Sequence, residues 1–214
     1  MRFILKNIGL LLTLLVTTSL PLVAQAAPFQ EGQDYKLLSK PQSTIDKDKV
    51  EVREFFWYGC PHCYHFEPTL AAWLKKLPSD VAFVRTPAVF RESWKAHAKA
   101  YFAAETLGVT DKIHADLFDA YHQKGKKTDT EEALAAFFVE RGVDEKEFHK
   151  TFNGFFVDMK LRDAMAKPAK YGITGVPAVV VNGKYRVTGS MAKGYPRMIE
   201  IIDFLIEKER KPSS

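Results

Sequence analysis

The chain has 214 residues, of which 46% are hydrophobic and 27% charged, with a formal net charge of +5 at pH 7. This length suits one domain, with or without an insertion. No stretch interleaves basic and aromatic residues, so the mild positive charge gives no reason to expect a nucleic-acid groove. Cys60 and Cys63 are the two cysteines of the chain, and a core of this size needs no disulfide staple.

The N-terminus has the three parts of a secretory signal peptide. Arg2 and Lys6 give a basic start, Ile8 to Val16 (IGLLLTLLV) an apolar core, and Ala24-Gln25-Ala26 an A-x-A cleavage site. We therefore predict a signal peptide over residues 1–26. A retained membrane anchor is the alternative, but the apolar stretch is shorter than the ~20 residues that span a bilayer. Cleavage leaves 29 of the 31 basic residues and all 26 acidic ones, a net charge of +3, in an oxidising compartment.

The first part of the mature chain alternates between strand and helix patterns. Residues 29–41 are predicted as an extended arm, and residues 50–58 (VEVREFFWY) as a strand buried on both faces. Apolar residues at spacings of three and four predict a helix over 61–77, with Pro61 near its first position. A second short buried strand is expected over 81–84.

Four helical segments are predicted next, each ended by a glycine or a proline. They cover residues 93–108, 110–125, 129–142 and 144–167. The third would be capped by Asp129 with Glu132, and the fourth would end before Pro168. Six phenylalanines are expected to form the core of this bundle: Phe102, Phe118, Phe137, Phe138, Phe148 and Phe152.

The pattern then returns to strands. Residues 178–181 and 184–188 flank Asn182-Gly183, a strong signal for a β-hairpin, and a last helix is expected over 196–208. The order is strand, helix, strand, four helices, hairpin, helix. This order predicts an α/β unit interrupted by a helical insertion from about residue 90 to residue 166.

The spacing Cys60-Pro61-His62-Cys63 allows three interpretations. A structural disulfide closing so short a loop would contribute only about 2 kcal/mol by the chain-entropy formula. A zinc site would need four ligands, and no second C-x2-C or H-x3-5-H pair follows. The remaining histidines, at 97, 114, 122 and 149, are expected at the surface or at caps. A redox pair is the third interpretation, and C-x-x-C beside an α/β pattern in an exported chain favours it.

The redox interpretation gives each residue of the motif a role. With Cys60 at the helix N-cap, free N–H groups and the positive end of the helix dipole would favour its thiolate, making it the nucleophile. Cys63, one turn further in, would be the resolving thiol. His62 could donate a hydrogen bond or partial charge to the Cys60 thiolate. A thiol pKa lowered by about four units would raise the reduction potential by roughly 70 mV, as in a disulfide donor.

Together CPHC, the preceding EFF, the segment YGITGVPAVVVNGKY and the helical insertion resemble the DsbA family of thiol:disulfide oxidoreductases. The resemblance implies a thioredoxin-like α/β fold formed by residues 27–89 and 167–214, with residues 90–166 as an inserted helical domain. It places the reactive and resolving thiols at Cys60 and Cys63, and tuning residues at Pro61 and His62.

Further residues follow from the same resemblance. Val176 and Pro177 match a cis-proline loop beside the disulfide, whose backbone would pair with an extended substrate. Glu54 matches a buried acidic residue beneath the active site, and Arg85 aligns with its basic partner. An ordinary ion pair without a catalytic role is the alternative for these two.

The function expected is oxidation of cysteine pairs in newly exported, reduced or unfolded proteins of the periplasm. Substrates would lie along an apolar surface near Trp57, Tyr58 and Val176, without any cofactor beyond the redox-active disulfide and without a metal. The resemblance implies a DsbB-like, quinone-linked membrane protein as reoxidant, and a monomer is expected.

Three alternatives to a disulfide donor remain at this stage. An isomerase or reductase would use the same motif with the pair kept reduced. A peptide-binding chaperone would work without its cysteines, and a zinc module would lose its fold to chelators.

Overall fold

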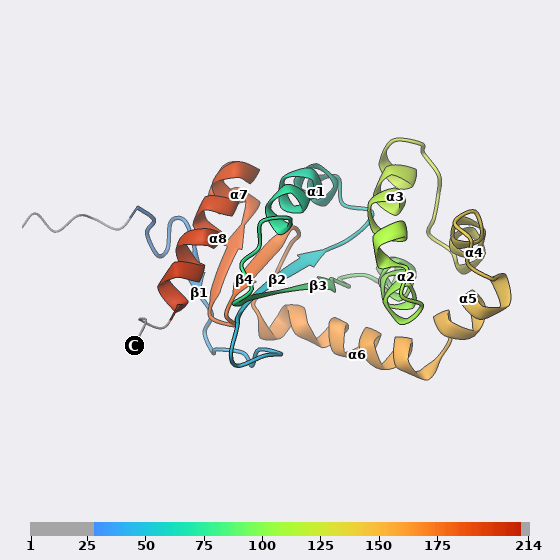
Figure 1. Cartoon of the computed structure of the whole chain (residues 1–214), viewed down its shortest axis with the longest axis horizontal. Helices are drawn as coiled ribbons and strands as arrows, with labels where there is room; N and C mark the ends of the chain where they lie inside the picture. Colours follow the sequence, from blue (N-terminus) through green and yellow to red (C-terminus); the bar gives the residue numbers. More distant parts are fainter. Residues whose placement is uncertain (1–27, 211–214) are drawn as a thin grey trace, which may run out of the picture.

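A five-stranded mixed sheet forms the centre of the protein (Figure 1). The computed structural model describes residues 28–210, so the predicted signal peptide lies outside the described residues. The strands are β1 Lys36–Leu37, β2 Val50–Phe56, β3 Val81–Pro87, β4 Ala178–Val181 and β5 Tyr185–Thr188, in the spatial order β1-β5-β4-β2-β3. Among the helices of residues 28–210, none combines the length and apolarity that a bilayer crossing requires.

The central strand β2 is parallel to β3 and antiparallel to β4. Every residue of β2 is buried, as its near-continuous apolar sequence predicts. The parallel pairing needs a crossover, which helix α1 Pro61–Leu74 supplies. The edge strand β1 pairs with β5 in an antiparallel register, with Lys36 opposite Arg186.

The predicted hairpin joins β4 to β5. Asn182 and Gly183 have φ angles of 49° and 63°, and they form the centre of a tight turn in which the Lys184 N–H bonds to the Val181 carbonyl at 3.0 Å. A Cβ atom on Gly183 would lie 2.1 Å from the carbonyl oxygen of Gln42. Glycine is therefore needed both for the turn and for the approach of the N-terminal arm.

Helices cover both faces of the sheet. Helix α1, the short α7 Gly189–Ala192 and α8 Tyr195–Glu209 lie on one face, where Val52, Phe66 and Ile202 belong to one buried cluster. Helix α6 Phe155–Lys170 runs along the opposite face (Figure 1). There Phe55 and Val180 pack against Tyr171, which caps the end of α6.

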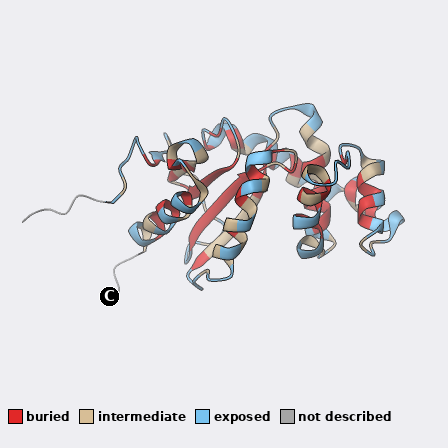
Figure 2. Cartoon of the chain, turned by 90° about the horizontal axis from the view of Figure 1, so that it is seen from above, coloured by how far each residue is buried: buried red, intermediate tan, exposed pale blue. Residues whose placement is uncertain are grey.

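The insertion between β3 and β4 is helical, as predicted. After a 3-10 turn, Glu92–Trp94, come α2 Lys95–Thr106, α3 Thr110–His122, α4 Glu131–Val139 and α5 Glu145–Phe152, followed by α6. All six phenylalanines expected in the bundle core are buried, which confirms that prediction. Figure 2 shows the buried stripes of these helices facing one another.

Three details of the insertion differ from the sequence prediction. The fourth segment is two helices, because the chain breaks at Asn153-Gly154 between α5 and α6. The N-cap of α4 is Thr130, whose hydroxyl accepts a hydrogen bond from the Ala133 N–H, and not Asp129.

Helix α6 also does not stop before Pro168, which lies inside it. Its stop signal is Gly172, with φ 60°. The N–H of Gly172 bonds to the carbonyl of Ala169, and that of Ile173 bonds to Pro168. These two bonds form a Schellman motif, which ends the helix three residues later than a proline signal suggests.

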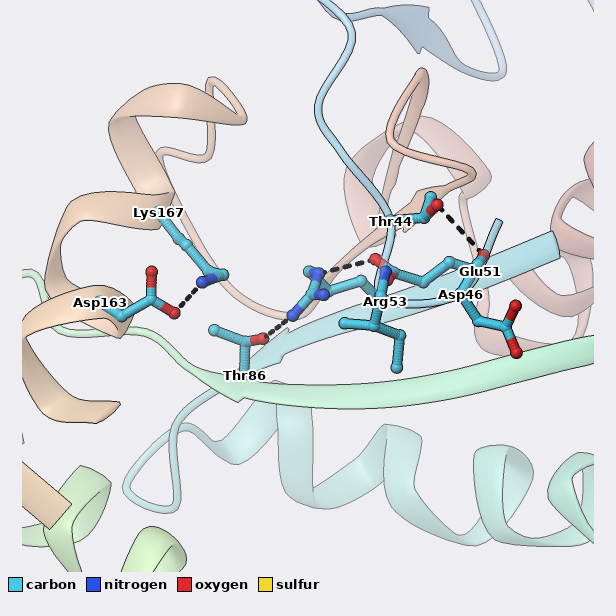
Figure 3. Close-up of polar contacts among 8 residues, drawn as sticks. Thr44, Asp46, Glu51, Arg53, Thr86, Asp163 and Lys167 are labelled. Carbon is cyan, nitrogen blue, oxygen red and sulfur yellow. Dashed lines mark hydrogen bonds and ion pairs between the residues drawn. The ribbon is translucent and has the colours of Figure 1, made fainter. Parts of the chain in front are cut away.

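A buried polar cluster lies on the α6 face of β2 (Figure 3). The Arg53 guanidinium donates from Nε to Glu51 Oε1 at 2.9 Å and from Nη1 to Thr86 Oγ1 at 2.8 Å. Glu51 Oε2 accepts the backbone N–H of Ile45 at 2.8 Å. Each buried charge in this cluster has a partner, and the contacts tie the loop before β2 to the sheet.

Candidate active site

The cysteine pair lies where β2 passes into α1. Cys60 is the N-cap residue, with φ −88° and ψ 115°, and Pro61 occupies the first helical turn. Cys60 is 7% exposed and Cys63 is 1% exposed, and both are free thiols in the structure. The structure thus places one sulfur at the helix terminus and the other in the core, as the sequence predicts.

Gly59 allows the turn before Cys60. A Cβ atom at this position would lie 2.3 Å from the Trp57 ring, and the Cys60 N–H bonds back to the Trp57 carbonyl at 3.0 Å. The indole of Trp57 therefore lies against the backbone that carries the first cysteine, and only glycine fits between them.

The two thiols have opposite electrostatic environments. The hydrogen bond with the Cys63 side chain, together with the backbone N–H groups of Cys63 and His62, lowers the pKa of Cys60 to about 6. The charge of His62 contributes in the same direction but less. Burial raises the pKa of Cys63 well above its usual value, and the neighbouring Cys60 and Glu54 add to that effect. Near neutral pH the thiolate is therefore on Cys60.

A second loop lies against the thiols. The Val176-Pro177 peptide bond is cis, and the Cys60 sulfur lies 3.4 Å from the Val176 carbonyl oxygen, to which it donates a hydrogen bond when protonated. A cavity of about 700 Å³ opens beside this contact, lined by His62, Val176 and Pro177 among others. The loop identified in the sequence thus borders both a reactive sulfur and a cavity.

Glu54 and Arg85 are in contact inside the protein, as the sequence suggests. Arg85 Nε lies 3.1 Å from Glu54 Oε2, and Glu54 is 1% exposed. The same guanidinium donates from Nη2 to Glu67 Oε1 of α1 at 2.6 Å. Arg85 thus bridges two acidic side chains, of which the sequence pointed to only one.

The chain of polar contacts continues into the helical insertion. Glu67 Oε2 lies 3.4 Å from His114 Nε2 of α3, and His114 Nδ1 lies 2.9 Å from the Tyr58 hydroxyl. We refer to Glu54, Arg85, Glu67, His114 and Tyr58 as the buried chain. Its Glu67 and His114 were missed because they are 47 positions apart, in segments whose contact no local pattern indicates.

Burial and the central arginine distribute protons unevenly along the buried chain. Burial raises the pKa of Glu54 to about 8, even though Arg85 opposes this shift. Burial also works against ionised Glu67, but His114 and Arg85 outweigh it and lower its pKa. Burial lowers the pKa of His114. At neutral pH the dominant state is therefore a protonated Glu54, an Arg85–Glu67 ion pair and a neutral His114.

The prediction that Tyr58 lies on a substrate-binding surface is wrong. Tyr58 is 1% exposed and packs against Phe56 and Phe118, because β2 ends at Phe56 and the following turn directs the ring into the helical insertion. Trp57 is half-buried and stacks on Trp94, with ring centroids 3.9 Å apart. Its contact with substrate stays a prediction.

Two of the histidines also differ from expectation. His97 and His114 are buried, at 1% and 6% exposure, and neither is a surface residue. His122 Nε2 lies 2.8 Å from the Tyr58 carbonyl oxygen and so supports the turn before Cys60. Within residues 28–210 no group of three or more His, Cys, Asp or Glu side chains is arranged to hold a metal ion.

These observations define a class of protein. A mixed sheet with a β2-α1-β3 unit, a C-x-x-C pair at the N-terminus of α1 and a cis-proline loop against the first sulfur describe a thioredoxin-like thiol:disulfide oxidoreductase.

Comparison with known proteins gives the family. Residues 51–198 match the family model described as DSBA-like thioredoxin domain. The chain is 41% identical over 205 residues to the thiol:disulfide interchange protein DsbA of Pseudomonas aeruginosa, covering 96% of this chain and 97% of the relative. It is 38% identical over 200 residues to that of Burkholderia cepacia, covering 93% and 94%.

Solved structures agree with these sequence relatives. The crystal structure of Pseudomonas aeruginosa DsbA superposes with a TM-score of 0.82 at 43% identity, covering 85% of this chain and 95% of that one. That of the Xylella fastidiosa oxidoreductase DsbA has a TM-score of 0.78 at 37% identity, covering 83% and 95%. The chain belongs to the DsbA family and is a thiol:disulfide oxidoreductase with a thioredoxin-like fold.

Proposed function

We propose that the protein oxidises cysteine pairs in exported proteins by donating a disulfide between Cys60 and Cys63. The observation that carries this proposal is the opposite shift of the two thiol pKa values at the start of α1. Stabilising the Cys60 thiolate stabilises the reduced protein, and the disulfide gains nothing comparable. The pair is thereby a better electron acceptor.

In the first step, the substrate reacts with Cys60, the more exposed sulfur of the pair. A substrate thiolate attacks the Cys60 sulfur, a bond forms between them, and the Cys60–Cys63 bond breaks with its electron pair going to Cys63. Cys63, whose environment disfavours the thiolate, takes up a proton. Attack at Cys63 is disfavoured because that sulfur is in the core.

The second step releases the oxidised substrate. A second substrate thiolate attacks the substrate sulfur of the mixed disulfide, and Cys60 leaves as a thiolate, which its low pKa favours. The substrate has lost two electrons, and the protein holds a Cys60 thiolate and a Cys63 thiol. Val176, at the cavity edge, supplies backbone against which an extended substrate can lie.

Glu54 suits the proton requirement of the first step. With a pKa of about 8 it is mainly protonated at neutral pH, and its charge influences the Cys63 thiol. It can therefore supply a proton to Cys63 as the disulfide opens. Arg85 retains its proton, because the acidic groups Glu54 and Glu67 outweigh burial and raise its pKa, so it holds Glu54 in place and does not transfer a proton.

The wider setting belongs to the same proposal. We place the mature protein in the periplasm as a monomer, divided into a thioredoxin-like part (27–89 and 167–214) and an inserted helical domain (90–166). Turnover requires reoxidation by a DsbB-like, quinone-linked membrane protein, and no cofactor beyond the disulfide. The family and the C-x-x-C geometry support this setting.

The first experiment equilibrates the Cys60–Cys63 pair against graded glutathione buffers and traps the thiols. A potential well above the glutathione range is expected for a donor, and a potential near or below it would indicate a reductase or isomerase. The double variant Cys60→Ser, Cys63→Ser should lose oxidation of a reduced test protein entirely. Retained oxidation would contradict the proposed chemistry, whereas retained peptide binding alone would indicate a chaperone.

A further inference from the structure

The α6 face of the sheet carries a row of cations at one level across the strands. Arg53 of β2 is opposite Val180, Val180 is opposite Arg186 of β5, and Arg186 is opposite Lys36 of β1. Because directly paired positions place their side chains on the same face, Arg186 and Lys36 are like charges next to each other. Such a pair destabilises a sheet unless an anion lies between the two charges.

The cations at the two ends of this row differ in whether they have polar partners. Arg53 is satisfied by Glu51 and Thr86 (Figure 3). Among residues 28–210, neither Lys36 nor Arg186 has a side-chain hydrogen bond or a carboxylate within ion-pair distance. The Nε atom of Arg186 is buried and has no hydrogen-bond partner, although a buried donor is normally paired.

Both cations line the cavity beside the cis-proline loop. Lys36 and Arg186 contribute to the same 700 Å³ cavity as His62, Val176 and Pro177. None of the described residues lining it is acidic, and three can carry positive charge. The guanidinium of Arg186 lies over Gly172, where a Cβ atom would come within 2.8 Å of Nη1. The main chain at Gly172 thus leaves room for the guanidinium at the cavity wall.

We propose that Lys36 and Arg186 form an anion-binding subsite in this cavity, which binds an aspartate or glutamate side chain of the substrate protein near its reacting cysteine. The subsite rests on the proposed function, since it selects among the substrates of the Cys60–Cys63 disulfide. A carboxylate would relieve the repulsion between the cations. Arginine pairs with carboxylates in a two-bond geometry that suits this role.

The sheet register gives the approximate reach. Val180, the residue opposite Arg186, is four positions from Val176, so the subsite lies about 13 Å from the loop that contacts Cys60, at about 3.3 Å per residue. Arginine and lysine side chains shorten this span. We therefore expect the acidic residue about three to five positions from the reacting cysteine of an extended substrate.

The test measures how fast single-cysteine peptides reduce the oxidised full-length mature protein at low ionic strength. One glutamate is moved from two to six positions on either side of the cysteine, and each peptide has a glutamine twin. The readout is the ratio of second-order rate constants, glutamate over glutamine. Intrinsic differences between the peptides cancel, because the same pair is used with every variant.

In the wild type the ratio should peak at one position, and Arg186→Gln should lower that peak about five- to tenfold. Lys36→Gln should lower it about two- to threefold, and Arg186→Lys should retain most of it. The matched controls are Arg162→Gln, exposed on α6, and Lys146→Gln, exposed on α5. They remove the same charge elsewhere and should leave the ratio as in the wild type. Added salt should shrink the peak.

Several outcomes would overturn the subsite. One is a glutamate-over-glutamine ratio that is the same at every position. Another is an equal fall of the ratio with Arg186→Gln and Arg162→Gln, which would mean that net charge alone attracts the peptide. If Arg186→Gln does not fold by circular dichroism, Lys36→Gln and Arg186→Lys decide by the same ratio. Failure of the proposed function looks different, since then neither peptide series would reduce the wild-type disulfide.

Discussion

On the α1 face of the sheet, charges are buried in a connected chain, whereas on the α6 face they divide into a satisfied cluster and an unsatisfied pair. Arg85 bridges Glu54 and Glu67 below the cysteines, and Arg53 on the opposite face is held by Glu51. Arg186 and Lys36 lie at the same level of the sheet as Arg53. Neither of them has a carboxylate partner among the described residues.

This difference separates two uses of a charged side chain. A charge whose partners are internal contributes to the folded state, and removing one partner leaves the other buried and uncompensated. A charge without an internal partner at a cavity wall contributes little to folding and is free for a ligand. Stability measurements should therefore distinguish the two, even though the side chains are chemically alike.

The largest loss of stability is expected when an arginine with an internal carboxylate partner is replaced. Arg85→Met and Arg53→Met should each lower the free energy of unfolding by about 3 kcal/mol, because each leaves a buried carboxylate without its cation. At about 2–4 °C per kcal/mol this lowers Tm by roughly 6–12 °C. Arg186→Met should change it by less than about 0.5 kcal/mol.

Thermal and urea unfolding of the reduced proteins at pH 7 would check these three values together. A loss at Arg186 as large as that at Arg85 would show that Arg186 has a structural partner and would remove the contrast between the two faces.

The two thiols offer a second comparison, between a sulfur at a helix terminus and a sulfur in the core. The alkylation rate of Cys60 should have its pH midpoint near 6, in line with its pKa. Cys63→Ala should raise this midpoint by about two units, and His62→Ala by about half a unit, since the Cys63 side chain is the larger cause. Iodoacetamide kinetics between pH 4 and 10 would measure both. A larger shift with His62→Ala would reverse this ranking.

Glu54 should make stability depend on pH. Folded Glu54 keeps its proton up to about pH 8, whereas an unfolded glutamate loses its proton near 4.3. Between these values the folded state holds the extra proton, so the stability of the wild type falls as the pH rises. Glu54→Gln should lack this fall, which is up to about 1.4 kcal/mol per pH unit between pH 5 and pH 8, and so gain stability relative to the wild type as the pH rises.

The matched control for Glu54 is Glu67→Gln. The pKa of Glu67 is lowered in the folded state, so its contribution to stability is present at neutral pH and is lost on acidification. The two variants should therefore change the pH profile of unfolding in opposite directions. Profiles that shift in the same direction would contradict the proton distribution described for the buried chain.

A modest effect is expected at Tyr58. Tyr58→Phe removes the hydroxyl 2.9 Å from His114 Nδ1 and should cost about 1 kcal/mol of stability. Because Tyr58 is in the core, the oxidation rate of a test peptide should not change. A higher KM with unchanged stability would restore the surface role that the sequence suggested.

Most of the architecture could be predicted because its signals are local. The helix period in α1, the Asn182-Gly183 turn and the bundle phenylalanines each depend on neighbouring residues, and the structure confirms them. The end of α6 could not be fixed, since the Schellman motif at Gly172 outweighs the proline signal at Pro168.

The site could be predicted only where a motif marks it. Cys60, Cys63 and the Val176-Pro177 loop meet as expected. The direction of Tyr58 could not be predicted, because side-chain alternation stops where β2 ends at Phe56. The Glu67–His114 contact depends on how the insertion packs against α1, and the pairing of Arg186 with Lys36 depends on the sheet register, which no local pattern specifies.

The stack of Trp57 on Trp94 joins the segment before Cys60 to the first turn of the helical insertion, with the rings inclined by only 6°. Two indoles this close share their excited states, and the resulting exciton signal in circular dichroism depends on their mutual orientation. The tryptophan pair is thus an intrinsic spectroscopic probe of the junction between the redox centre and the insertion. A spectrum recorded during turnover would report any movement there without an attached dye.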